Sequence, residues 1–172
     1  MKTTLKLVLV IAFVALCGNV SAQNLKLAHI NMQELIASMP ENDSAMVKLN
    51  KLQQTLEEEM ENIQVEYRRK LDDYSKVEAN LTDIVKQSKI QELQSLQQRI
   101  QLFQEQAQQS LESEYNKLMQ PVVEKANKAI ETVAKEQNIT YVLSDNPQII
   151  PFKAIGTLDL LPAVKQHLGI KK

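Results

Sequence analysis

"LNKLQQTLEEEMENIQVEYRRKLDDY", residues 49–74, contains neither proline nor glycine, and it lies in a longer run, residues 41–120, that lacks both. Apolar and aromatic side chains recur in it every three or four residues, the spacing that places them on one face of an α-helix. Charged side chains occupy the other faces. This first stripe comprises Leu49, Leu52, Leu56, Met60, Ile63, Tyr67, Leu71, Tyr74, Val77, Leu81 and Ile84. The pattern predicts an amphipathic helix too long for a compact domain, with Asp43 or Ser44 as its N-cap.

A second stripe follows the first and comprises Ile90, Leu93, Leu96, Ile100, Phe103, Ala107, Leu111, Tyr115, Leu118 and Val122. Between the stripes, Asn80 or Thr82 can cap a new helix, and Asp83 suits its first turn. We therefore expect two antiparallel helices joined at a tip near residues 79–83. A first arm over residues 44–79 is on the order of 50 Å long, at about 1.5 Å per residue. One unbroken rod remains an alternative, because the phase of the stripe does not break at the tip.

The segments on either side of the hairpin are short. Composition predicts strands at residues 25–32, 139–143 and 148–152, one or two helical turns before Pro40, and a closing helix at 158–168 ended by Gly169. Pro121 marks a kink or a helix start, and Asn138 is the expected stop of the helix before residue 139. We expect a small body from residues 23–42 and 121–172, with residues 43–120 inserted as an arm. Such a body is marginal alone, and joining about three sheets edge to edge would add burial.

The N-terminus has the features of an export signal. Lys2 and Lys6 precede an apolar run over residues 7–17, and "VSA" stands before Gln23, which predicts a signal peptide over residues 1–22. A lipoprotein signal acylated at Cys17 remains an alternative, although Leu16 stands where a small residue is usual. Without Lys2 and Lys6, 18 of the 20 basic residues remain against 21 acidic ones, a net charge of −3. That balance does not predict binding to nucleic acid or to an anionic membrane.

Residues that carry enzyme chemistry are sparse. Only Gly156 and Gly169 remain after the signal, so no glycine loop can cradle a phosphate group. His29 and His167 fall in different predicted elements, and neither has a companion at metal-binding spacing. No nucleophile, base and acid stand in a recognisable arrangement. We expect a protein that is not an enzyme and uses no metal, no cofactor and no ATP.

The order of these segments resembles the Skp/OmpH family of periplasmic chaperones. The likeness rests on the signal, "LKLAHINMQEL" (residues 25–35), the charged hairpin, "AIETVAKEQNITYVLSD" (residues 129–145) and the short closing helix. It implies a mainly α fold with a small β body, in which a coiled-coil hairpin projects from an oligomer-forming, β-barrel-like base. It also implies a periplasmic homotrimer that holds unfolded outer-membrane proteins between its arms without ATP. Transient contact with the outer-membrane assembly machinery is implied only by this likeness.

Two sets of residues follow as candidates for binding. The resemblance assigns oligomerisation to strands at residues 27–31 and 140–144, and the residues singled out are Leu27, His29, Ile30, Tyr141, Val142 and Leu143. Two helices cannot cover every apolar side chain of the hairpin, so a loose collective surface for unfolded proteins is expected on the arms. Its candidate members are Met60, Tyr67, Tyr74, Val85, Leu102 and Phe103.

One departure from the family concerns charge. The best-studied members have basic arms, whereas residues 43–120 here hold ten basic and fourteen acidic side chains. Lys76, Lys86 and Lys89 gather near the tip, and the return arm is rich in glutamine. A local positive patch at the tip and a neutral face for an unfolded backbone are possible functions, but ordinary solvation of an exposed helix is the favoured explanation of both features. A coiled-coil spacer or adaptor of the cell envelope and a module for one dedicated partner therefore stay open as alternative functions.

Overall fold

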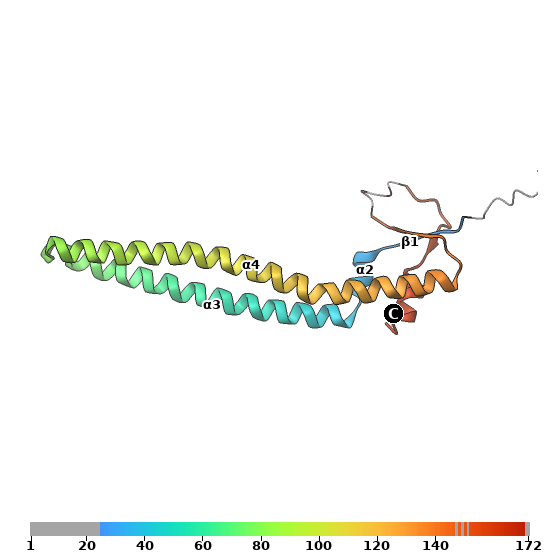
Figure 1. The fold of residues 1–172 in the computed structure, drawn as a ribbon, viewed down its shortest axis with the longest axis horizontal. Coiled ribbons are helices and arrows are strands. Elements are labelled where there is room, and N and C mark those ends of the chain that lie inside the picture. The colour runs from blue at the N-terminus through green and yellow to red at the C-terminus, as the bar shows by residue number, and fades with distance from the viewer. Residues whose placement is uncertain (1–24, 147, 149, 151, 171–172) are drawn as a thin grey trace, which may run out of the picture.

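Two long antiparallel helices dominate the computed structural model, which describes residues 25–146, 148, 150 and 152–170 (Figure 1). Helix α3 (Pro40–Val77) runs out from a small base, and helix α4 (Asp83–Glu136) returns to it. A short 3-10 turn, η1 (Glu78–Asn80), and the extended residue Leu81 reverse the chain. The predicted hairpin and its tip are confirmed, and the unbroken rod is wrong. The predicted signal peptide, residues 1–22, lies outside the described residues.

The start of α3 differs from the prediction. Met39 is the extended N-cap residue and Pro40 takes the first helical position, three residues before Asp43. Proline suits that position because its fixed φ is helical and its missing N–H would have no partner there. Ser44 does not cap the helix, and its hydroxyl donates instead to the Pro40 carbonyl at 3.1 Å. The prediction of an N-cap at Asp43 or Ser44 is therefore wrong.

Helix α4 passes from the arm into the base without a break. Pro121 lies inside it, so the prediction of a helix start at Pro121 is wrong. The helix ends where expected, because Asn138 adopts a left-handed conformation with φ 54°, which asparagine tolerates better than most residues. The Ile139 N–H then donates back to the Ala134 carbonyl at 2.8 Å. One helix thus supplies both an arm and a wall of the base.

The base contains a three-stranded parallel sheet in the order β2-β1-β3. Its strands are β1 (Leu27–Ile30), β2 (Tyr141–Ser144) and β3 (Leu158–Asp159), and two short helices, α2 (Met32–Ala37) and α5 (Leu161–His167), complete it. The strand and the helical turns predicted before Pro40 are confirmed, as is the strand that follows Asn138. The whole hairpin forms most of the connection from β1 to β2.

Two further predictions, both for the C-terminal part of the chain, are wrong. Of the strand expected at residues 148–152, the described residues Gln148, Ile150 and Phe152 are not in a strand, and 149 and 151 lie outside the described residues. The third strand is instead Leu158–Asp159, where the closing helix was expected to begin. The Leu161 N–H donates to the Asp159 carboxylate at 2.9 Å, which starts α5 only after the strand. Gly169, with φ 71°, follows the end of α5 as expected.

The main hydrophobic core lies at the base. From α4, Val122, Ala126, Ala129 and Val133 pack against one face of the sheet, together with α2 and α5. In the base, the elements that approach α4 most closely are α2 and α5. In the arm, by contrast, only Leu49, Ile63 and Leu96 are buried outside this core. No helix in the described part of the chain is long and apolar enough to cross a membrane.

Candidate functional site

The two helices of the arm meet along a narrow seam with polar bridges. Ile63 and Leu96 are buried between the helices. Lys70 pairs with Glu92 across the seam, and the Gln97 amide donates to the Tyr67 hydroxyl at 2.7 Å. The Lys70 hydrogen bond holds the pKa of the Glu92 carboxyl below its usual range. The seam aligns the helices but leaves much of their apolar surface uncovered.

The six residues proposed for a collective arm surface divide into two groups. Val85 is 40% exposed and Leu102 is 54% exposed, while Met60, Tyr67, Tyr74 and Phe103 are half-buried along the seam. Further large apolar side chains are open on the arm, and these are Met46, Val47, Val65, Leu71, Val77, Ile84, Ile90 and Tyr115. The exposed apolar surface is therefore broader than the sequence-based set and lies on both helices.

The hydroxyls of Tyr67 and Tyr74 have hydrogen-bond partners. The Tyr74 hydroxyl donates to Glu78 at 3.1 Å, four residues further along the chain. Desolvation by neighbouring atoms raises the pKa of the Tyr74 hydroxyl, and the hydrogen bond to Glu78 adds to that effect. Both tyrosines therefore help to fix the arm as well as presenting ring surface.

Three of the cations near the tip pair with acidic side chains, whereas Lys86 makes no ion pair within the described residues. A groove there is lined by Arg69, Lys70, Lys76 and Lys89 together with acidic and apolar side chains. Lys76 pairs with Asp72, while Lys70 and Lys89 both lie against Glu92. These three lysines therefore have acidic partners within the arm, whereas Arg69 makes no ion pair within the described residues.

The sheet has one covered and one open face. Ala28 and Ile30 of β1 are buried toward α4, and Val142 of β2 packs against the same core. Leu27 pairs in register with Tyr141, and His29 with Leu143, so these four share the opposite face. On it Leu27, Tyr141 and Leu143 are exposed. The structure thus places three of the six oligomerisation candidates on an open apolar face.

His29 lies on the open face but is itself only 8% exposed. Its Nδ1 stands 3.4 Å from the Asp145 carboxylate and has no hydrogen-bond partner among the described residues. Asp145 pairs with Lys153, whose hydrogen bond lowers the pKa of the Asp145 carboxyl. Lys153 is therefore held by charge against Asp145, the first residue after β2. Within the described residues, no three His, Cys, Asp or Glu side chains form a metal-binding group.

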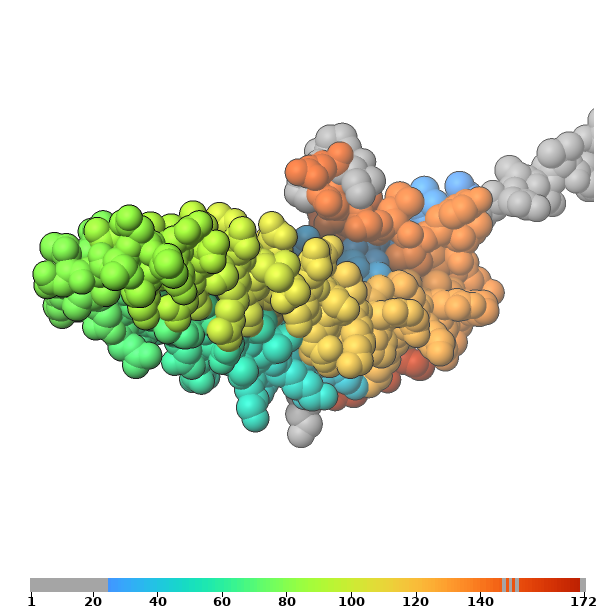
Figure 2. Space-filling view, turned by 60° about the vertical axis from the view of Figure 1, so that its left-hand side comes forward, coloured from blue at the N-terminus to red at the C-terminus, as the bar shows by residue number. Residues whose placement is uncertain are grey.

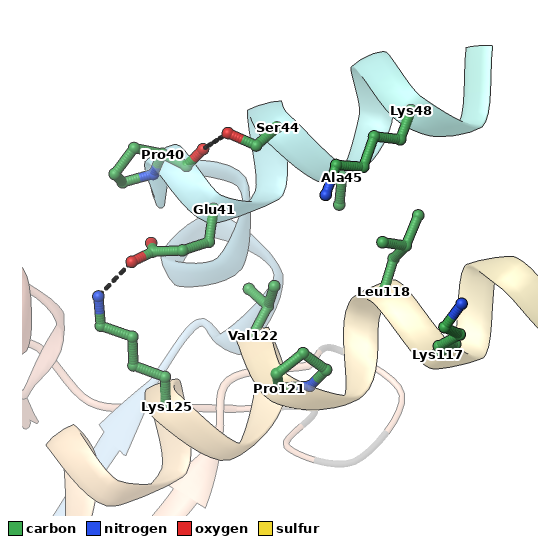
Figure 3. A pocket seen from close by; sticks show the side chains of 10 residues that line it. All are labelled: Pro40, Glu41, Ser44, Ala45, Lys48, Lys117, Leu118, Pro121, Val122 and Lys125. Atoms are coloured by element: carbon green, nitrogen blue, oxygen red, sulfur yellow. Dashed lines mark hydrogen bonds and ion pairs between the residues drawn. The ribbon is translucent and has the colours of Figure 1, made fainter. Parts of the chain in front are cut away.

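A groove of about 560 Å³ lies where the arm joins the base (Figure 3). Ala45 and Leu118 face each other across it, and the Glu41 carboxylate pairs with Lys125 at one end. This pair holds the pKa of Glu41 below its usual range. Lys48 and Lys117 also line the groove. Sequence reasoning missed this groove because its two walls are more than sixty residues apart in the chain.

Comparisons with known proteins agree with this architecture. A family model described as outer membrane protein (OmpH-like) matches residues 26–168. A comparison with curated proteins gives no significant match. Among solved structures, the chain is similar to a protein from Caulobacter crescentus described as an outer membrane chaperone (OmpH-like), with a TM-score of 0.72. Sequence identity is 15%, and the alignment covers 83% of each chain, so this likeness is one of fold.

Proposed function

We propose, because the chain belongs to the OmpH-like family, that it is an ATP-independent holdase chaperone. In this proposal it binds unfolded outer-membrane proteins between its helical arms and prevents their aggregation. The periplasm is its site of action, reached through a cleavable signal over residues 1–22. Handing clients to the outer-membrane assembly machinery belongs to the same proposal.

The observation that carries the proposal is the uncovered apolar surface of the arm. Val65, Ile84, Val85 and Leu102 are exposed on helices that no other described part of the chain covers. Large apolar side chains on an otherwise charged arm favour contact with other apolar chains. Each contact is weak, but many contacts inside a confined space hold a client through avidity without fixing its structure.

A homotrimer is the second part of the proposal. The sheet has two edge strands, β2 and β3, and an open apolar face with Leu27, Tyr141 and Leu143. Unpaired edges and exposed apolar faces favour association with further strands. Three copies that join through this face and these edges would form a barrel-like base. Their three arms would then enclose a cavity.

Light scattering tests the function directly. An outer-membrane β-barrel protein is diluted from urea into buffer without nucleotide, with and without residues 23–172 of this chain. We expect scattering to fall at a near-stoichiometric ratio of oligomer to client, while an equal mass of an unrelated folded protein has no effect. Unchanged scattering with folded, oligomeric protein would contradict the holdase function and favour an envelope spacer or a dedicated partner.

A further inference from the structure

The face of α4 turned away from α3 carries a regular row of glutamines. Their spacing alternates between four and three residues from Gln87 to Gln101, the next position of this pattern is Glu105, and Gln108 follows it. All the glutamines are exposed: Gln87, Gln91, Gln94, Gln98, Gln101 and Gln108. This glutamine face lies on the opposite side of the helix from Leu96 and Phe103, which point into the seam. In Figure 2 the α4 half of the arm, light green to yellow, is open along its length.

The glutamine face is uncharged from residue 84 to residue 104, and Glu105 ends this neutral stretch. Between residues 84 and 104, α4 has four charged side chains, and none falls on this face of the helical wheel. Glu92 and Arg99 make ion pairs with α3, Lys89 pairs with Glu92, and Lys86 is half-buried on the flank. The neutral surface is about 30 Å long, at about 1.5 Å per residue.

The amides of this face have no hydrogen-bond partner among the residues that the structure describes. Elsewhere, Gln53, Gln54 and Gln120 each donate to a glutamate four residues on, and Gln97 donates to Tyr67. None of the six side chains of the glutamine face makes such a bond within the described residues. Each therefore offers a free donor and a free acceptor, the same pair of groups that a peptide unit offers.

The outward face of α3 is charged, unlike the glutamine face of α4. It carries charges that are paired with one another, for example Arg68 with Glu61 at 2.6 Å and Lys76 with Asp72. Residues 43–120 as a whole have four more acidic than basic side chains. An acidic unfolded chain is therefore repelled by the arm in general but not by the glutamine face.

We infer that the glutamine face binds the backbone of unfolded polypeptides whatever their net charge. This inference rests on the proposed holdase function and names the surface through which it accepts acidic clients. Ile84, 82% exposed, and Leu102 stand at the edge of the face and add apolar contacts. The face has no aromatic ring on which a sugar could stack, which favours polypeptide over glycan. A hydrogen bond exchanged with water gains little, so the contact is weak and distributed.

The test compares two triple variants with the same change in charge. Q91E/Q94E/Q98E places three carboxylates on the glutamine face, and Q53E/Q54E/Q64E places three on α3. Binding of a urea-unfolded, net-acidic outer-membrane β-barrel protein is measured by fluorescence at about 0.05 M and about 0.5 M salt. We expect the α4 triple to weaken binding roughly threefold to tenfold at low salt and to recover at high salt, while the α3 triple stays within about twofold of wild type.

A third variant separates the amides from charge. Q91A/Q94A/Q98A keeps a helix-favouring sequence and adds no charge, and we expect binding to weaken about twofold to threefold at both salt concentrations. Binding like wild type by this variant, or equal losses in the two Glu triples, would overturn the inference and leave the holdase function intact. So would a change of oligomeric state confined to the α4 triple, or displacement of the client by soluble glycan strands. Failure of the wild type to bind the client would instead overturn the holdase function itself.

Discussion

Asp145, the first residue after β2, connects the open face of the sheet to the loop that follows. Its carboxylate pairs with Lys153, eight residues on, and lies 3.4 Å from Nδ1 of His29. The Lys153 hydrogen bond, the largest influence, lowers the pKa of Asp145. A carboxyl whose pKa is lowered by folding stabilises the folded state above its unfolded-state pKa, and this contribution disappears as pH falls through the folded-state value.

Asp145→Asn tests this contact through its pH dependence. We expect the variant to be less stable than wild type at neutral pH. The difference should shrink as pH falls below the ordinary aspartate value of about 3.9, because wild-type Asp145 then becomes neutral as well. Urea unfolding monitored by circular dichroism at fixed protein concentration measures it across the pH range. Lys153→Met should show the same profile, and a loss independent of pH would contradict the charge pairing.

At the scale of elements, the long periodic helices could be predicted because their stripes persist over many turns. The third strand could not, since Leu158–Asp159 is only two residues long and its pairing partner is β1, far away in the sequence. The sequence predicts an end of the helical turns before Pro40 and a kink or a helix start at Pro121, but proline is compatible with the first turn of a helix, and α4 continues through Pro121 at an exposed interior position. Sequence alone does not distinguish these cases.

The candidate surfaces were predictable to a similar degree. Val85 and Leu102 fall off the apolar stripes, and both are exposed as that position suggests. Tyr67 and Phe103 lie on the stripes and are half-buried. Predicting the groove of Figure 3 requires knowing which residues of the two helices lie opposite each other. Periodicity does not give this register, because either stripe can slide along the other by a turn. Which strand residues face outward likewise depends on the side of the sheet that α4 covers.

Pro121 is the one interior residue of α4 that cannot donate a backbone hydrogen bond, so the Lys117 carbonyl lacks its usual partner. Because Pro121 is exposed, we expect Pro121→Ala to restore that bond and to stabilise the chain by about 1–3 kcal/mol. Urea unfolding at fixed protein concentration measures the change. Gln108→Ala, at another exposed position of α4, should change stability by no more than about 0.5 kcal/mol. A less stable Pro121→Ala variant would show that the proline ring is needed where it lines the groove beside Pro40 and Ala45.

At the scale of the whole molecule, the core that stabilises the protomer and the exposed apolar surface of the arm lie in different parts of the structure. Its main core lies in the base, while the arm is held by a narrow seam and cross-helix bridges such as Lys70–Glu92. Helix α4 belongs to both parts, so the direction of the arm is tied to the packing of the sheet. Assembly through the open sheet face would therefore also set how the arms stand relative to one another.

Tyr141→Glu/Leu143→Glu tests that assembly. Both side chains lie on the open face and outside the core of the protomer, so charge there should separate the subunits without unfolding them. Burying one large apolar side chain is worth about 1.5–3 kcal/mol, so we expect the dissociation constant of the oligomer to rise at least roughly a hundredfold. Sedimentation velocity measures the change, and circular dichroism checks the fold. Val65→Glu, which places a carboxylate on an equally exposed apolar site of the arm, should leave the oligomer intact.

The Tyr141→Glu/Leu143→Glu variant also distinguishes binding of a client by the surface of one arm from binding in a cavity between several arms. Separated subunits keep every exposed apolar side chain of the arm and the whole glutamine face, so a client lost with the oligomer must have been held by several arms at once. We expect the Tyr141→Glu/Leu143→Glu protein to lose most of its suppression of aggregation at equal chain concentration, because linked weak sites bind far more tightly than single ones. Full suppression by separated subunits would contradict binding in a shared cavity and show that one arm is sufficient.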